Sequence, residues 1–173
     1  LGAVAGVPAG IVDDAVRLLT AAADRALDAG SLRMAVRHAS RALDLTDLHP
    51  IAPEERAHLY LVRADAYTDQ RNFAAAGSDI GALATIADEL DDVALQAEAL
   101  RLRGSLSHLA GRIEDARLEL GRAVDLLRHA EHPALLAQAL RIRGFIEMFG
   151  GSLVDAEWFF GEADGLYQSL ADE

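Results

Sequence analysis

The sequence predicts an all-α fold, a right-handed superhelix of four helix-turn-helix repeats that together form an α-α solenoid. Residues 100–123 recur at 140–163, forty positions later, and both copies open on the pattern Leu-Arg-x-Arg-Gly. Repeats of this length are typical of stacked supersecondary units. The chain is 51% hydrophobic but only 5% aromatic, and its apolar residues are mainly alanine and leucine, which favour helices. Both observations indicate helical hairpins in series.

Two earlier units share the register of this pair. A small residue recurs in the first helix of each unit and lets the second helix approach closely; these residues are Ala23, Ala64, Gly104 and Gly144. Glycine in the turn between the helices supplies the left-handed conformation that ends a helix. The aligned turn residues are Gly30, Arg71, Gly111 and Gly151. We expect a lead-in segment over 1–10 and one domain over 11–173, with units at about 11–50, 51–91, 92–131 and 132–173.

Capping residues place the individual helices in order. Ser31 is a good N-cap for the second helix of the first unit. Pro53 and Pro133 fall in the first turns of the second and fourth units, where a missing N–H costs no hydrogen bond. Ser152 caps the last helix and, with Asp155, approximates a capping box. The expected helices are 11–29, 31–46, 53–69, 72–89, 92–110, 112–129, 133–149 and 152–170.

Two further positions recur along the chain. Arg63, Arg103 and Arg143 share one site, and we expect their stems to pack along the helix flank while their guanidinium groups pair with acids of adjacent units. A glycine recurs inside the second helices of the last three units, although it costs about 0.5–1 kcal/mol relative to alanine. We expect close approach of the next unit there, with a hinge as the alternative; the residues are Gly81, Gly121 and Gly161.

This arrangement resembles the tetratricopeptide repeat, which has small residues at its eighth, twentieth and twenty-seventh positions. The last two units match with Gly104, Ala116 and Ala123, and with Gly144, Ala156 and Ala163. The period of about 40 exceeds the usual 34 residues, and the proline expected after the second helix is mostly absent. Longer units of this type are similar to arrays in large bacterial signalling proteins, including LuxR-type transcription regulators.

The resemblance implies a protein–protein interaction scaffold that binds a protein or peptide partner. It further implies the regulatory or sensory arm of a larger bacterial signalling or transcription-regulatory protein; the alternative is a module that binds a small anionic effector in its concave groove. Family positions that line this groove carry over to first-helix residues of three units. They are His58, Asp65, Glu98, Arg101, Ser105, His108, Gln138, Arg141, Phe145 and Met148.

Two of these groove residues allow opposite interpretations. Arg101 and Arg141 lie one repeat apart, so they are able to grip a carboxylate or phosphate with bidentate hydrogen bonds. Alternatively the groove is only solvated, and Arg101 pairs with Glu98 one turn away on the same helix.

The last helix is more apolar than its counterparts in the earlier units. Trp158, Phe159, Leu166 and Leu170 are spaced to form a stripe on it. A stripe of this size is either covered by a following repeat or used as an interface. We expect self-association of the chain through this terminal helix.

Composition narrows the classes of function. The net charge is −12 and all 16 basic residues are arginine, so the chain repels a phosphate backbone and is not expected to bind nucleic acid. It contains no cysteine, which excludes disulfides and thiolate metal sites and fits a cytoplasmic protein. No apolar run reaches the 18–20 residues, roughly, of a membrane span.

The sequence carries no recognisable catalytic constellation. Its six histidines include no His-Glu-x-x-His pair and no spacing typical of zinc. No glycine-rich loop follows a predicted strand, so the usual nucleotide-binding scaffold is missing. We therefore expect neither enzymatic activity nor a bound metal or cofactor.

Overall fold

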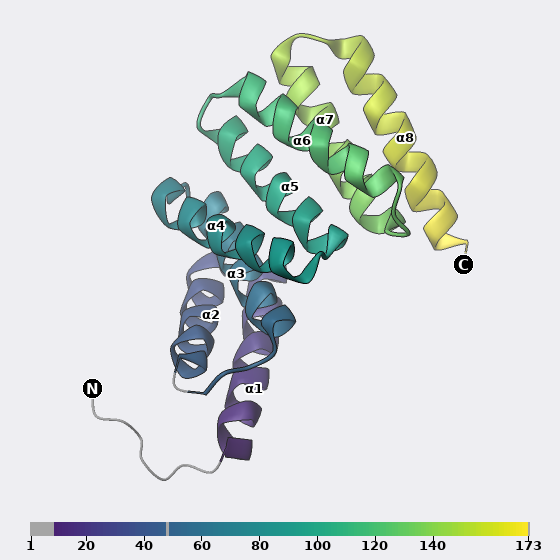
Figure 1. Ribbon diagram of the computed structural model, residues 1–173. Coiled ribbons are helices and arrows are strands. Elements are labelled where there is room, and N and C mark those ends of the chain that lie inside the picture. The colour runs from purple at the N-terminus through teal and green to yellow at the C-terminus, as the bar shows by residue number, and fades with distance from the viewer. Residues whose placement is uncertain (1–8, 48, 173) are drawn as a thin grey trace. The chain divides into compact units, whose positions relative to one another are not determined.

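The computed structural model describes residues 9–47 and 49–172, and within these ranges it contains eight α-helices and no strand (Figure 1). This confirms the all-α prediction. Helix α1 starts at residue 9, inside the predicted lead-in segment, whose residues 1–8 lie outside the described part. The helices are α1 (Ala9–Asp28), α2 (Leu32–Thr46), α3 (Pro53–Asp69), α4 (Phe73–Leu90), α5 (Val93–Leu109), α6 (Ile113–Arg128), α7 (Pro133–Gly150) and α8 (Leu153–Ala171).

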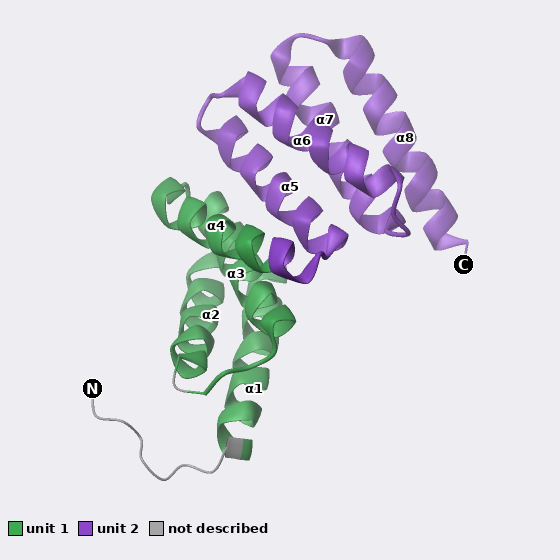
Figure 2. Ribbon diagram, in the orientation of Figure 1, with its two compact units in different colours: residues 1–86 green, residues 87–173 purple. Residues whose placement is uncertain are grey.

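The chain divides into two compact units at a point inside α4 (Figure 2). Unit 1 ends at Ile86 and unit 2 begins at Ala87. In unit 1, α1 packs on α2, α2 packs on α3, and α1 also contacts α3. In unit 2, α5 packs on α6, α6 on α7 and α7 on α8, while α5 also contacts α7. Within each unit, therefore, each helix packs on its successor and the first helices of successive hairpins meet. The single domain over 11–173 stays a prediction.

Small residues in the first helices permit the predicted close approach within hairpins. A Cβ atom added to Gly104 would lie 2.7 Å from Leu120 Cγ, and one added to Gly144 would lie 2.7 Å from Phe160 Cε1. Both distances are below any real Cβ contact, so an alanine at either position would force the facing side chain of α6 or α8 to shift.

The turns inside the hairpins adopt the predicted left-handed conformation. Gly30, Gly111 and Gly151 have φ values of 68°, 78° and 99°. Arg71 occupies the same position of the second hairpin and has φ 58° without being glycine. Register in the repeat, and not residue type, therefore identifies this turn, and the arginine accepts a conformation that costs an L-residue about 1–2 kcal/mol.

Of the two predicted serine N-caps, one makes the expected hydrogen bond and the other does not. Ser152 Oγ accepts a hydrogen bond from the Asp155 backbone N–H at 3.4 Å, as predicted. Ser31 precedes α2 but its side chain makes no cap hydrogen bond, which corrects the prediction. Its backbone, at ψ 59°, lies outside the extended region that turns an N-cap hydroxyl toward the helix. Asp92, which the sequence analysis missed, caps α5 through the Leu95 N–H at 3.0 Å.

Each unit has its own hydrophobic core of alanine and branched aliphatic residues. Each fully buried leucine or isoleucine side chain contributes about 1.5–3 kcal/mol relative to an exposed one, whereas the alanines chiefly allow the helices to lie close. The core of unit 1 contains Val16, Ala23, Ala39, Ala42, Leu43, Leu59 and Val62. Unit 2 has two clusters, Ala97, Val124, Leu127, Ala139, Leu140 and Ala163, and Ala116, Leu120 and Ile146.

Candidate functional site

The predicted groove residues are divided between the two units. His58 and Asp65 lie on α3 of unit 1, and both are half-buried. The others lie in unit 2, where α5 and α7 contact each other. Helix α5 carries Glu98, Arg101, Ser105 and His108, and α7 carries Gln138, Arg141, Phe145 and Met148. The structure therefore gives two candidate surfaces, one in each unit.

On α5 the charged pair of the predicted groove is neutralised internally. Arg101 Nε donates to Glu98 Oε2 at 2.5 Å, and the two side chains are only 13% and 12% exposed. This is the pairing that the sequence allowed as the alternative to an anion-binding arginine. Arg101 is thus engaged within the protein and does not stand open beside Arg141.

Exposed apolar and cationic side chains gather along α7. The Arg141 guanidinium lies over the Phe145 ring at 5.9 Å, and Phe145 packs edge-on against Phe160 at 5.1 Å. Phe145 and Met148 remain 39% and 36% exposed. Phe149, which sequence reasoning missed, is 70% exposed. It is the second-last residue of α7, and the aligned residue is the smaller Leu109, so its only signal was this difference.

The terminal helix presents a different apolar surface from the one predicted. Phe159 and Leu166 pack against the core of unit 2 instead of facing outward, which corrects the prediction of one exposed stripe. Their spacing of seven residues places both on the face of Ala163, which is buried against α7. Leu170 is half-buried. The exposed large hydrophobic residues of α8 are Leu153, Val154, Trp158 and Tyr167.

Trp158 itself is held by neighbours on both sides. Its ring meets the Phe159 ring edge-on at 4.8 Å, and the Arg128 guanidinium lies over it at 5.5 Å. Arg128 also pairs with Glu162 at 2.8 Å. The indole is therefore oriented although it is 53% exposed.

The recurring arginine of unit 1 forms a bidentate ion pair. Arg63 Nε and Nη2 each donate to one carboxylate oxygen of Asp79 at 2.7 Å, and Nη1 donates to Ser40 Oγ at 3.0 Å. The side-chain hydrogen bond with Asp79 raises the pKa of Arg63 against the opposing effect of burial. Asp79 belongs to the same hairpin as Arg63, so the predicted pairing with an acid of an adjacent hairpin is wrong for this residue. The adjacent hairpin contributes the Ser40 hydroxyl instead.

The same site in unit 2 changes its partners. Arg103 Nη1 lies 3.8 Å from Glu119 Oε2, in the position of the Arg63 pair. Arg143 faces Phe159 at the aligned place and lies over its ring at 5.4 Å. Its Nη1 would be 3.7 Å from a Cβ at Gly121. Only this arginine side chain comes near Gly121, and a Cβ at Gly81 or Gly161 would meet nothing within 4 Å, so the expected close approach of the next repeat at these glycines is wrong.

A buried carboxylate ties α6 to α7. Glu147 is 4% exposed at its side chain and accepts from Arg117 Nη2 at 2.7 Å and from Arg143 Nε at 2.9 Å. Arg117 also pairs with Glu114 at 2.6 Å. These hydrogen bonds, with Glu147 first, raise the pKa of Arg117. The guanidinium nitrogens of Arg117 and Arg143 and both carboxylate oxygens of Glu147 have partners inside the fold, so these three residues hold the helices together.

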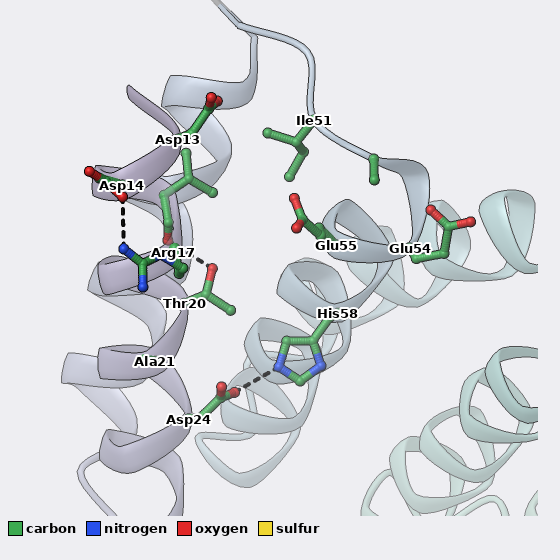
Figure 3. Close-up of a pocket in the computed structure, with 12 residues that line it drawn as sticks. Asp13, Asp14, Arg17, Thr20, Ala21, Asp24, Ile51, Glu54, Glu55 and His58 are labelled. Atoms are coloured by element: carbon green, nitrogen blue, oxygen red, sulfur yellow. Dashed lines mark hydrogen bonds and ion pairs between the residues drawn. The ribbon is translucent and has the colours of Figure 1, made fainter. Parts of the chain in front are cut away.

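A hollow of unit 1 lies between α1 and α3 (Figure 3). It encloses about 750 Å³, which is within the range of ligand-binding clefts, roughly 300–1,000 Å³. Its apolar lining consists of small and branched side chains, Val16, Ala21, Ile51 and Ala52. At one end His58 Nε2 is 2.8 Å from Asp24 Oδ1, which joins the two helices across the hollow.

Carboxylates dominate the rim of this hollow. Asp14 pairs with Arg17 at 2.7 Å, whereas Asp13, Glu54 and Glu55 have no ion-pair partner among the residues that the structure describes. The predicted groove included only His58 of this set. The two acidic pairs, at the start of α1 and after Pro53, were visible in the sequence, but nothing in the sequence showed that they share a cavity.

Neither a cluster of metal-binding side chains nor a membrane-spanning helix occurs among the described residues. No three histidine, aspartate or glutamate side chains in 9–47 and 49–172 are grouped so that they could hold a metal ion. No helix in the same ranges is both long and apolar enough to cross a membrane.

No protein-family model matches the chain, and no curated protein sequence matches it significantly. Among solved structures, the apo form of RapI is similar with a TM-score of 0.76 at 14% identity, over 92% of this chain and 58% of that one. BtubC from P. vanneervenii is similar with a TM-score of 0.73 at 18% identity, over 91% and 65% respectively. The chain thus spans less than two thirds of either. These likenesses show the fold alone, an α-solenoid of helical hairpins, and the tetratricopeptide type stays a prediction.

Proposed function

We propose that this chain is a protein-interaction scaffold. The observation that carries the proposal is the contrast between the two sides of the first helices. Their buried sides build the cores, while their other sides keep side chains suited to recognition, namely the hollow beside α3 and the partly exposed Arg141, Phe145 and Met148 of α7. Arginine and aromatic residues are enriched at protein interfaces, and arrays of helical hairpins present such faces to partners.

We further propose that the chain is the regulatory or sensory arm of a larger bacterial signalling or transcription-regulatory protein, acting in the cytoplasm. The support is the repeat of about 40 residues, which is similar to arrays in those proteins. The acidic charge of −12 favours protein partners over nucleic acid. We assign no catalysis and no cofactor to this chain, because its candidate surfaces combine carboxylates and apolar side chains without a nucleophile–base pair.

A small anionic effector is the less favoured candidate. It requires two arginines free to grip one ligand, and Arg101 already pairs with Glu98 at 2.5 Å. Arg141 is exposed but lies over Phe145. A thermal-shift screen against anionic metabolites tests this candidate, because a stabilisation that is lost in Arg141→Ala would favour the effector over a protein partner.

Self-association through α8 is a second proposed interaction. Leu153, Val154 and Trp158 are 69%, 79% and 53% exposed on this helix, and contiguous exposed apolar surface marks an interface more often than chance. Sedimentation of a Trp158→Glu/Val154→Arg variant tests it. We expect the parent chain to sediment as a larger species than the variant, and an unchanged mass would remove the idea.

Site-specific photo-crosslinking tests the scaffold proposal directly. Benzoylphenylalanine is introduced at Phe145, which is 39% exposed on α7, and separately at Leu118, which is 55% exposed on α6. In a lysate of the source organism we expect a discrete protein adduct from position 145 and none from position 118. Identical adducts at both positions, or no adduct at either, would contradict a partner-binding face on the first helices.

A further inference from the structure

The hollow between α1 and α3 has a defined wall, floor and closed end. Its wall carries the small side chains Ala21 and Ala52, so the volume of about 750 Å³ stays open between two helices that are in contact elsewhere. Val16 at the base is buried in the core of unit 1, which gives the floor a fixed apolar surface. One end is closed by the contact between His58 and Asp24 at 2.8 Å.

The charge around this floor determines what can enter. Asp13 on α1 and Glu55 on α3 stand on opposite sides of the hollow (Figure 3), and neither has an ion-pair partner among the described residues. Both carboxylates are exposed, and with Glu54 they give the hollow a negatively charged rim that attracts a cation. A cationic side chain at this rim would meet three carboxylates that have no ion-pair partner among the described residues.

We infer that this hollow binds a basic segment of a partner protein, with one arginine or lysine side chain inserted between Asp13 and Glu55. The inserted side chain places its aliphatic stem against Val16 and Ala21 and its charged end at the acidic rim. The inference rests on the proposed scaffold function and names the chemistry of the partner at one site. It also sets this site apart from the anionic effector, which the rim would repel.

A segment of chain fits the hollow better than a free amine does. The cavity is several times larger than one lysine or arginine side chain, so residues beside the inserted one also contact the walls. Glu54, in the first turn of α3, points away from α1 (Figure 3) and extends the acidic rim beyond the mouth. A second basic residue of the same segment would meet this carboxylate.

Fluorescence anisotropy with short probe peptides tests the inference on the full 173-residue chain. The probe is a labelled, terminally blocked peptide, Ala-Arg-Leu-Arg-Ala, and its matched controls replace both arginines by citrulline or by glutamate. At low salt we expect saturable binding of the arginine peptide, and binding about five- to thirtyfold weaker for the citrulline peptide because both charged contacts with the rim are lost. Equal binding of these two peptides would overturn the inference.

Two double variants of equal charge separate the hollow from the general acidity of the chain. Asp13→Asn/Glu55→Gln removes both facing carboxylates, and Asp28→Asn/Asp44→Asn removes two exposed carboxylates of unit 1 that do not line the hollow. We expect the first variant to bind the arginine peptide about five- to tenfold more weakly and the second less than twofold. If both variants lost the same affinity for the arginine peptide, the peptide would be responding only to the net charge of the chain, which would contradict the site.

A steric variant and a small probe complete the test. Ala21→Phe fills the hollow from its wall without changing the charge of the chain. We expect this variant to lose peptide binding while circular dichroism reports unchanged helicity. Retained binding would overturn the inference. Argininamide should compete only weakly, and competition as strong as that of the peptide would replace the partner protein by a small amine. A crosslinked partner at position 145 without peptide binding would overturn this inference alone, whereas the loss of both results would also remove the scaffold proposal.

Discussion

Both units consist of helical hairpins, but the exposed faces of their first helices carry different side chains. In unit 1 the face between α1 and α3 is hollow, and three of the carboxylates that line it lack ion-pair partners among the described residues. In unit 2 the exposed side of α7 carries Arg141 over Phe145, and Arg101 and Glu98 of α5 pair with each other. The buried sides are alike in that both units bury many alanines among leucine, isoleucine and valine.

The difference shows how a repeat separates stability from recognition. At the crossing of α5 and α6 a side chain at position 104 would clash, because a Cβ added to Gly104 would lie 2.7 Å from Leu120 Cγ. Face positions make no such contact, so their residues are free to differ between repeats. Arg63 and Arg143 occupy the same repeat position at the edge of the buried side. Arg63 pairs with Asp79 in unit 1, whereas Arg143 lies over the Phe159 ring in unit 2. Function in such a fold is carried by residues and not by architecture.

The sharpest test of this separation is the loss of the buried carboxylate of unit 2. We expect Glu147→Ala to lower the free energy of unfolding by about 3 kcal/mol, because it leaves Arg117 and Arg143 without their buried partner. Glu114→Ala removes the other carboxylate on Arg117, which is 83% exposed, and should cost less than about 0.5 kcal/mol. Urea unfolding followed by the fluorescence of Trp158, the single tryptophan of the chain, measures both.

A paired glycine replacement tests which positions belong to the buried side. Gly104→Ala should destabilise by about 1–3 kcal/mol, because the new Cβ overlaps Leu120. Gly161→Ala meets no atom within 4 Å and should stabilise by about 0.5–1 kcal/mol through helix propensity. Thermal unfolding followed by circular dichroism reports both changes. Shifts of the same sign would mean that the contact at Gly104 does not restrict its residue.

The non-glycine turn of unit 1 offers a smaller effect in the opposite direction. Arg71 has φ 58° where the other hairpins have glycine, so Arg71→Gly should raise the free energy of unfolding by about 0.5–1 kcal/mol. The reverse change, Gly111→Arg in unit 2, should lower it by a comparable amount. Chemical unfolding of both variants checks the pair, and a stabilising Gly111→Arg would show that the two turns are not equivalent.

The smallest effect concerns the terminal surface of unit 2. Arg128→Ala removes an exposed ion pair with Glu162 and the guanidinium over Trp158, and should cost only about 0.5–1 kcal/mol. The emission of Trp158 should nevertheless change, because its cationic neighbour is gone. An unchanged spectrum would indicate that the contact is not populated in solution.

The sequence predicted the parts of the fold that depend on spacing. Helix ends fell within about two residues of their positions, because glycine, serine and proline mark turns by their own conformational preferences. The turn at Arg71 was found through register alone. The close contacts at Gly104 and Gly144 followed from the recurrence of small residues at one place.

The sequence did not predict features that depend on three-dimensional neighbours. Whether Arg143 meets an acid or a ring depends on side chains from two helices, and Phe159 differs from Trp158 in burial only because α7 lies on one side of α8. The hollow of unit 1 escaped notice because α1 and α3 form its walls together. No residue of α4 marks the division at Ile86.

Amide chemical-shift mapping of the chain during titration with the arginine peptide compares the two faces directly. We predict that shifts gather on α1 around Asp13 and Ala21 and on α3 around Glu55 and His58, while α7 and α8 keep their spectra. Shifts spread evenly over the acidic surface, or centred on Phe145 and its neighbours, would contradict the assignment of the basic partner to the hollow of unit 1.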